Sequence, residues 1–319
     1  MKRVVPTVRA IVLCLILAIS STRGYSQSVS SGNGKWEIGL GFGPMFFLGD
    51  LGGTAGIGKP FVKDVDFPLT NLGKSLYLNY YASDFLAFRL SLNQGVLKGN
   101  DAEAPNKGGA EVDRLLRNLS FKSNVIDAYI AAEIYPTVFL EKYEEMKGKL
   151  RPYALIGAGM FKFNPKAKLD GKWVALTPLR LEGQGMAEYP DRKQYKLTQT
   201  EIVMGFGVKY WLKENFYIGF DLTHRDTETD YLDNVSTGYI DPNLFNTYLS
   251  AADAAKARRL YYRGLYSSPA TNPGAIQTFQ RGDPTENDAF FSALLRFGWR
   301  LNTYGDKLQR RQMRCPSFY

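Results

Sequence analysis

Few residues of this 319-residue chain could carry out chemistry, and the only histidine is the first to consider. His224 stands in LTHRDTETD, with the carboxylates of Asp226 and Glu228 close by in sequence. Lipid hydrolases and acyltransferases of the Ser–His–acid type also need a serine that the histidine can activate. No serine stands in a recognisable motif. We therefore predict an exposed polar histidine near a strand end, no enzyme activity, no cofactor and no small-molecule substrate.

Two further motifs in the same half of the chain are weak. The acids at 226, 228, 230 and 233 suggest calcium, but the run lacks the glycine and the distal glutamate of a calcium-binding loop. It is predicted to be a solvated acidic rim without a metal. Residues Arg281–Asp283 read RGD, which could suggest adhesion, but a turn before the last strand is the preferred interpretation.

Cysteines are the remaining reactive groups. Cys315 lies in QMRCPSFY at the end of the chain, and Cys14 lies in the apolar run IVLCLILAIS. Basic MKRVVPTVRA precedes this run and polar STRGYSQ follows it, a pattern typical of a secretory signal peptide. The run is shorter than the roughly 20 residues of a spanning helix, and IVLC lacks the small residues that a lipid-modified cysteine needs. We predict a signal peptide over 1–26, so the mature chain keeps one cysteine.

Composition limits what the mature chain can be. Removing residues 1–26 takes away four bases and no acid, so the net charge falls from +9 to +5. The chain shows no dense basic stripe and no nucleic-acid motif, and we expect no nucleic-acid partner. Aromatic residues make up 14% of the sequence, and there are 31 glycines. Such a composition, without apolar runs of helix-spanning length, favours many short strands.

Period-two alternation marks those strands. FLAFRLSLNQ, for example, sets apolar positions 86, 88, 90 and 92 against Ala87, Arg89, Ser91 and Asn93. WEIGLGFG, NVIDAYIAAEI, EIVMGFGVKYW, FYIGFDL and SALLRFGWRLN alternate in the same way. KSLYLNYY and RPYALIGAGMFKF add two strands whose faces are not assigned. The total is eight.

Connection lengths separate a membrane barrel from a soluble β-domain, which would also alternate. Tight turns are expected around Ser83–Asp84 and Lys213–Asn215, and a moderate segment around 136–150. The other connections are long: about 44–73, 98–118, 164–198 and 226–287. Outer-membrane barrels place short turns in the periplasm and long loops outside. We predict an all-β protein, an eight-stranded antiparallel transmembrane β-barrel with long extracellular loops and both termini in the periplasm.

Charged residues fall on the face opposite the apolar one. Eight strands enclose a space that side chains can fill, so the charges are predicted to pair into a polar plug. A narrow pore lined by them is the alternative. The predicted interior charges are Glu37, Arg89, Asp127, Glu133, Lys209, Asp221, Arg296 and Arg300.

The longest loop contains the Ala-rich segment YLSAADAAKARRLYYRGL. Positions 248, 251, 252 and 255 follow the i, i+3, i+4, i+7 spacing of one helix face. We predict a helix outside the membrane or over the barrel mouth, with this face as its apolar side.

Four segments resemble one known family. WEIGLGFGPMFFLGDLGG, RPYALIGAG, TDYLDNVSTGYID and QRGDPTENDAFF keep their order over nearly the whole mature chain and are similar to the PorG family. PorG-like proteins are outer-membrane barrel components of the type IX secretion system, which also serves gliding motility in some bacteria. The resemblance implies contact with a periplasmic ring of a PorK-type lipoprotein and a PorN-type subunit, and no catalytic residues.

The predicted organisation is a signal peptide (1–26), a periplasmic linker (27–35), a barrel in outer-membrane lipid (36–302) and a periplasmic tail (303–319). The tail carries Cys315 beside Arg310, Arg311 and Arg314. An odd cysteine in an exported protein suggests pairing with another chain, although an unpaired thiol on a frayed end fits as well. The resemblance favours an interchain disulfide to the ring, because the ring would supply the partner. A free-standing barrel that acts as an adhesin or a lipid enzyme is the alternative function.

Overall fold

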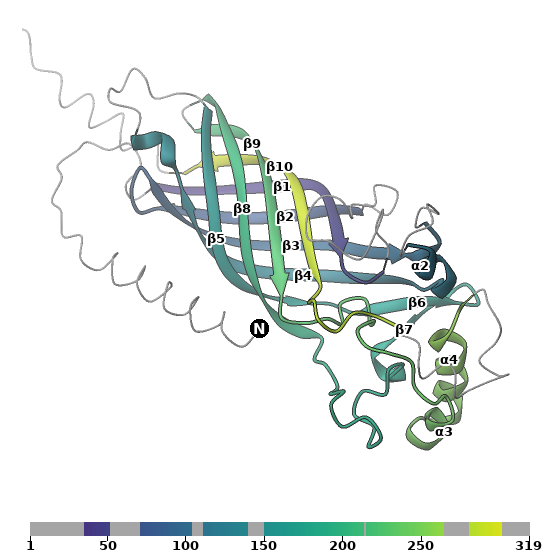
Figure 1. Cartoon of the computed structure of the whole chain (residues 1–319). Helices are drawn as coiled ribbons and strands as arrows, with labels where there is room; N and C mark the ends of the chain where they lie inside the picture. The colour runs from purple at the N-terminus through teal and green to yellow at the C-terminus, as the bar shows by residue number, and fades with distance from the viewer. Residues whose placement is uncertain are drawn as a thin grey trace, which may run out of the picture. The chain divides into compact units, whose positions relative to one another are not determined.

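The computed structural model describes residues 35–51, 71–103, 111–139, 150–213, 215–264 and 281–301. Eight long antiparallel strands follow one another around a closed barrel (Figure 1). These strands are β1 (Lys35–Leu48), β2 (Asn71–Tyr81), β3 (Leu86–Asn100), β4 (Ser120–Ile134), β5 (Leu150–Lys162), β8 (Thr198–Lys213), β9 (Phe216–Thr227) and β10 (Ala289–Arg300). The predicted eight-stranded antiparallel barrel is confirmed.

Pairing of the first strand with the last closes the barrel. The β1–β10 ladder runs from Glu37 opposite Arg300 to Leu48 opposite Ala289. Every barrel strand therefore has two hydrogen-bonded neighbours, and no barrel edge is left open. A closed sheet satisfies the backbone N–H and C=O groups internally, as a bilayer requires.

The outward face of the barrel is apolar, with the facing that the alternation predicts. Leu90 on β3, Ile130 on β4 and Phe206 on β8 are 46%, 63% and 63% exposed, while the residues on either side of each in its strand are buried or partly buried. Aromatic rings gather where β1 and β9 begin: Trp36 packs on Tyr80, and Phe216 on Trp299. Such an apolar band with an aromatic girdle is the surface that lipid requires. No described helix is long and apolar enough to cross a bilayer.

Short and long connections lie at opposite ends, as predicted. The turn after β2 (82–85) and the short connection between β8 and β9 define the turn end, where β1 also begins and β10 finishes. The loop end carries the long connections. Their described elements are η3 (Asp101–Glu103), α2 (Glu111–Arg117), β6 (Pro165–Leu169), β7 (Lys172–Ala175), η6 (Thr177–Leu179), α3 (Leu244–Tyr248) and α4 (Ala251–Tyr261), while η4 (Pro136–Phe139) follows β4 at the turn end.

The β6–β7 hairpin was not expected from the sequence, which predicted only a loop there. Its first strand adds to the loop end of β4, with Lys166 opposite Lys122. Buried Ala167 and Leu176 pack against α4 in one apolar cluster with Phe245 and Tyr261. Figure 1 shows α3, α4, β6 and β7 gathered at this end of the barrel.

Helix α4 confirms the predicted helix, but the predicted apolar face is wrong. Ala251, Ala252 and Ala255 are exposed, and the buried residues are Ala254, Ala257, Leu260 and Tyr261. Tyr248 ends α3 and Leu249 is extended, so Tyr248 shares no face with α4. The three alanines do share one face, but the large apolar side chains of α4, Leu260 and Tyr261, lie on another face, and that face is the buried one.

The strands occupy residues 35 to 300, compared with predicted barrel limits of 36 and 302. The predicted signal peptide, with Cys14, lies outside the described residues. The predicted tail lies outside them too, with Cys315 and the three arginines.

Candidate functional site

The turn-end half of the barrel interior holds a network of ion pairs. Lys209 on β8 donates from Nζ to Glu37 Oε1 at 2.8 Å and to Glu133 Oε2 at 3.2 Å. All three side chains are fully buried. Asn79 donates to both carboxylates, at 3.1 and 3.0 Å. One lysine therefore ties β8 to β1 and β4 across the barrel.

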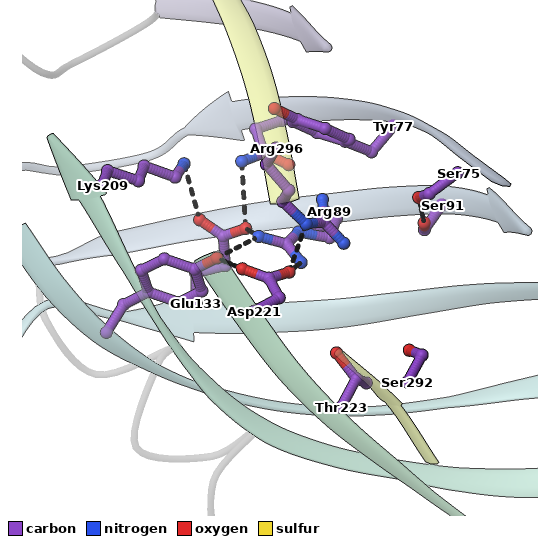
Figure 2. A network of polar contacts seen from close by, with 12 residues as sticks. Ser75, Tyr77, Arg89, Ser91, Glu133, Lys209, Asp221, Thr223, Ser292 and Arg296 are labelled. Atoms are coloured by element: carbon purple, nitrogen blue, oxygen red, sulfur yellow. Dashed lines mark hydrogen bonds and ion pairs between the residues drawn. The ribbon is translucent and has the colours of Figure 1, made fainter. Parts of the chain in front are cut away.

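Two arginines extend this network, as Figure 2 shows. Arg89 pairs with Glu133, and its Nη1 lies 2.6 Å from Asp221 Oδ2. Arg296 pairs with the same Asp221 carboxylate from β10 and stacks over the Tyr77 ring. A buried charge is tolerated only when it is paired and hydrogen-bonded, and here each base meets at least one carboxylate.

Tyrosine hydroxyls complete the inner network, and glycines make room for their rings. The Tyr77 and Tyr217 hydroxyls lie 2.6 Å apart, and Tyr217 donates to Glu37 Oε1 at 2.6 Å. A Cβ at Gly39 would lie 2.1 Å from the Tyr77 hydroxyl oxygen, and one at Gly298 would lie 2.3 Å from the Tyr217 ring. Because the inward glycines have no side chains, they leave the space that the large polar side chains fill.

A second network lies nearer the loop end. Arg225 on β9 donates from Nε to Asp127 Oδ2 at 2.8 Å and from Nη1 to the Ser292 hydroxyl at 2.9 Å. Asn93 also donates to Asp127, at 3.0 Å, and Glu201 is buried nearby. Arg225 and Glu201 were missed in the sequence. Alternation would have found them, because they continue the inward series of Asp221 on β9 and Lys209 on β8.

Seven of the predicted interior charges lie inside the barrel, and all seven are buried: Glu37, Arg89, Asp127, Glu133, Lys209, Asp221 and Arg296. Arg300 does not join them. It is only partly buried at the turn end, where its guanidinium lies 4.2 Å from the Trp211 ring centroid.

The interior holds a polar plug, and the one histidine of the sequence does not face it. His224 is on the outward face of β9, opposite Met204 and Phe291, away from the interior charges. Among the residues that the structure describes, no group of three or more His, Cys, Asp or Glu side chains is arranged to hold a metal ion.

The loop end carries a third polar cluster, which we call the loop cap. Four of its carboxylates accept hydrogen bonds from backbone N–H groups of distant segments. Asp50 accepts from Asp283 at 2.9 Å, and Asp233 accepts from Leu51 at 3.1 Å. The other two are Asp288, which accepts from Leu232, and Glu182, which accepts from Ser236 and Thr237.

Two arginines hold the loop cap together. Arg281 Nη1 lies 2.6 Å from Glu182 Oε1 and donates to the Asn234 carbonyl at 2.7 Å. Arg117 on α2 forms two bonds to Asp101, at 2.8 and 2.9 Å, and donates to the backbone carbonyls of Asp50 and Arg281. Arg281, the arginine of the RGD triplet, is therefore a buried structural residue.

The predicted solvated acidic rim is wrong for one of its four members. Asp226 and Glu228 are exposed and Asp230 is partly buried, but Asp233 is fully buried. Its two oxygens accept from Leu51 and Val235. The sequence could not show this, because the partner residue lies 182 positions away.

Burial changes the proton affinity of the cap carboxyls. It raises the pKa of Asp50 to about 6 and that of Asp230 to about 9. Burial and the neighbouring Asp50 carboxylate raise the pKa of Asp233 well above its usual range, and burial with Asp233 does the same for Asp288. The loop cap therefore holds protons at pH values where an exposed aspartate is ionised.

A closed eight-stranded barrel with an apolar outer belt and a filled interior defines a small transmembrane barrel of the outer-membrane type.

Comparisons with known proteins assign no family to this chain. No protein-family model and no curated protein matches the chain. Among solved structures, Ail, the attachment invasion locus protein of Yersinia pestis, is 10% identical with a TM-score of 0.37, over 84% of this chain and 99% of Ail. OprG from Pseudomonas aeruginosa is 12% identical with a TM-score of 0.36, over 85% and 98% of the two chains. Similarity at this level carries no argument about function.

Proposed function

We propose that the protein is a non-enzymatic outer-membrane barrel subunit of the type IX secretion machinery, which also serves gliding. In this role it anchors a periplasmic ring of PorK-type and PorN-type subunits to the membrane. The proposal rests on the resemblance of four sequence segments to the PorG family, and three of these segments meet in the loop cap.

The observation that carries the proposal is the contact of these three segments in the loop cap. WEIGLGFGPMFFLGDLGG supplies Asp50 and Leu51, TDYLDNVSTGYID supplies Asp233, and QRGDPTENDAFF supplies Arg281 and Asp283. Hydrogen bonds from backbone N–H groups to aspartate carboxylates join the first segment to the other two, at 3.1 Å and 2.9 Å. Three of the four segments that carry the resemblance therefore fold together. This supports the interpretation that they resemble the PorG family because of a common structural feature and not by chance.

The filled interior supports an anchoring role over conduction. Side chains of seven predicted charges and Arg225 occupy the lumen and form ion pairs across it, and Glu201 is buried there as well. A barrel of eight strands has an interior that side chains can fill. We therefore assign the function to the two ends of the barrel and to its lipid face.

We place the turn end in the periplasm, following the rule that short turns of such barrels face that side. Both β1 and β10 reach this end, so the linker 27–35 and the tail 303–319 enter the periplasm. The tail would present Cys315 and its three neighbouring arginines to the ring. Bases beside a thiol favour the reactive thiolate.

A pull-down from detergent-solubilised envelopes tests the anchoring role. Tagged full-length protein should retain a lipoprotein and a second periplasmic subunit in fixed ratio. A variant that ends at residue 302 should retain less of both while its barrel stays folded. Recovery of the wild-type protein as a monomer would contradict the proposal and favour the free-standing barrel.

Non-reducing gels of envelopes test the disulfide separately. We expect a higher-mass band that contains this protein and disappears with reductant and with Cys315→Ser. If wild type and Cys315→Ser run alike without reductant, no disulfide forms. Replacing Arg310, Arg311 and Arg314 by Gln then tests whether the tail docks through its charge.

A further inference from the structure

Beside the β6–β7 hairpin, the loop end carries a group of lysines that neither the plug nor the loop cap uses. Each of them alternates with a buried residue of the same strand, so each side chain points out of the barrel. The buried neighbours are Leu97, Phe121, Phe161 and Ala167. The lysines are Lys98 on β3, Lys122 on β4, Lys162 on β5, and Lys166 and Lys168 on β6, and we call this group the lysine face.

Strand register brings three of these lysines into one row. Lys98 is directly opposite Lys122, and Lys122 is directly opposite Lys166. Directly opposite side chains on one face have Cβ atoms about 5 Å apart, and like charges there are destabilising. A row of three cations across three strands therefore favours a bound anion.

Described acids do not neutralise this row. None of the five lysines forms an ion pair with a carboxylate in the described part of the chain. The one acid of the hairpin, Asp170, is held by Arg259 through two bonds of 2.6 Å. Within the described segments, the positive charge of the lysine face is therefore not neutralised by an ion pair.

The surroundings indicate what kind of partner. Toward mid-barrel, the outward face continues with exposed Ile126, Ile130 and Met160. Trp173 on β7 is 48% exposed, and its ring lies 5.3 Å from Lys122 Nζ. Tryptophan is typical of the boundary between acyl chains and headgroups. Cations directly above an apolar surface match an amphiphile with a negative headgroup.

We propose that the lysine face docks the phosphate groups of a phosphorylated lipid in the leaflet that borders the loop end. The lipid's acyl chains lie against the apolar belt, and its phosphates lie over the row of lysines. In the orientation given above, this is the outer leaflet. The binding does not depend on any periplasmic partner.

Native mass spectrometry of the full-length mature protein in detergent tests the docking. The probes are lipid A with both phosphates, the same lipid after dephosphorylation, and inorganic phosphate. Lysines near a lipid surface each contribute enough that replacing Lys98, Lys122 and Lys166 by Gln should weaken binding of the phosphorylated lipid about a hundredfold. The matched control replaces three other exposed lysines of the 163–197 connection by Gln and should stay within about twofold: Lys172, Lys193 and Lys196.

Three outcomes would overturn the proposal. They are equal binding of phosphorylated and dephosphorylated lipid, an unchanged affinity in the triple variant, and inorganic phosphate bound as tightly as the lipid. The last would assign the site to a free phosphate. Heat-dependent migration on gels checks that each variant is folded.

A single substitution provides a second readout that does not need the triple variant. Lys166→Gln removes one like-charge pair, so without phosphorylated lipid it should raise the unfolding midpoint. With saturating phosphorylated lipid, the wild type should instead be the more stable of the two, because ligand binding stabilises the folded state. If the ranking of the two proteins is the same with and without the lipid, no phosphate is held there.

Discussion

Buried carboxylates are central to both the interior networks and the loop cap, but the groups that they pair with differ. In the interior, the carboxylates of Glu37, Glu133 and Asp221 meet lysine or arginine side chains from other strands. In the loop cap, Asp50 and Asp233 accept from backbone N–H groups. Side-chain pairs join strands that the barrel already fixes, whereas carboxylate-to-backbone bonds give the long connections a defined shape. Damage to the first should affect the whole barrel, and damage to the second only the loops.

Arg89→Met should have the strongest effect. It leaves Glu133 and Asp221 with one cation fewer in a fully buried setting, and breaking a buried pair costs about 3–5 kcal/mol. Urea unfolding in detergent, followed by gel mobility, should show the whole barrel destabilised. Arg300→Met, at the partly exposed turn end, is the control and should change far less. Equal effects would show that the buried interior charges matter no more for stability than a charge at the turn end.

Leu90→Arg places a charge on the lipid face and should cost about 2–4 kcal/mol near mid-membrane. The same unfolding measurement in lipid bilayers checks it, with Leu90→Ile as the control.

The alternation alone predicts that arginine is tolerated better at inward Ser292 than at Leu90. The structure revises that prediction, because the Ser292 hydroxyl accepts from Arg225 and an added cation would lie beside it. Full stability of Ser292→Arg would contradict the described packing.

Arg281→Met should open the loop cap and leave the barrel intact. It removes the bond to Glu182 and the one to the Asn234 carbonyl, and leaving such buried groups unpaired costs about 1–3 kcal/mol. Protease cleavage within 228–264 should become faster, while the urea midpoint of the barrel stays unchanged. Arg258→Met, on the exposed side of α4, is the matched control. A shift of the barrel midpoint would show that cap and barrel unfold together.

The stability of the loop cap should fall as pH rises. An aspartate has an ordinary pKa of 3.8, and Asp230 titrates near 9 in the folded cap. The folded state therefore binds more protons between these values, and its advantage decreases from about pH 4 to about pH 9. Proteinase K cleavage within 228–264 should accelerate from pH 5 to pH 9. Asp230→Asn should flatten this profile, and identical profiles for the two proteins would exclude Asp230 as a cause.

Ser250→Ala should have the smallest effect. The Ser250 hydroxyl accepts from the Asp253 N–H at 3.2 Å and caps α4, a contact that contributes about 1 kcal/mol. Hydrogen exchange should rise in the first turn of α4 and nowhere in the barrel. Ser250→Asp, which can still cap, is the control and should retain protection.

The comparison also explains what the sequence could predict. Each interior position follows from alternation along its own strand, so Arg89 and Lys209 could be placed from local pattern alone. Arg225 was within reach of the same rule once its strand was continued by three residues, and Glu201 already stands first in the segment EIVMGFGVKYW. The cap contacts were not, because Asp233 binds Leu51 and Arg281 binds Glu182 across long stretches of chain. Hairpin β6–β7 is too short to show a period.

The glycines beside the interior tyrosines have a consequence for how this sequence can drift. No side chain fits at Gly39 while Tyr77 keeps its ring, nor at Gly298 while Tyr217 keeps its ring. A lineage that gains a side chain at either glycine must lose bulk at the facing tyrosine in nearly the same step. The glycine and the tyrosine of each pair are therefore expected to change together in evolution. An alignment of relatives should show covariation between positions 39 and 77 and between positions 298 and 217.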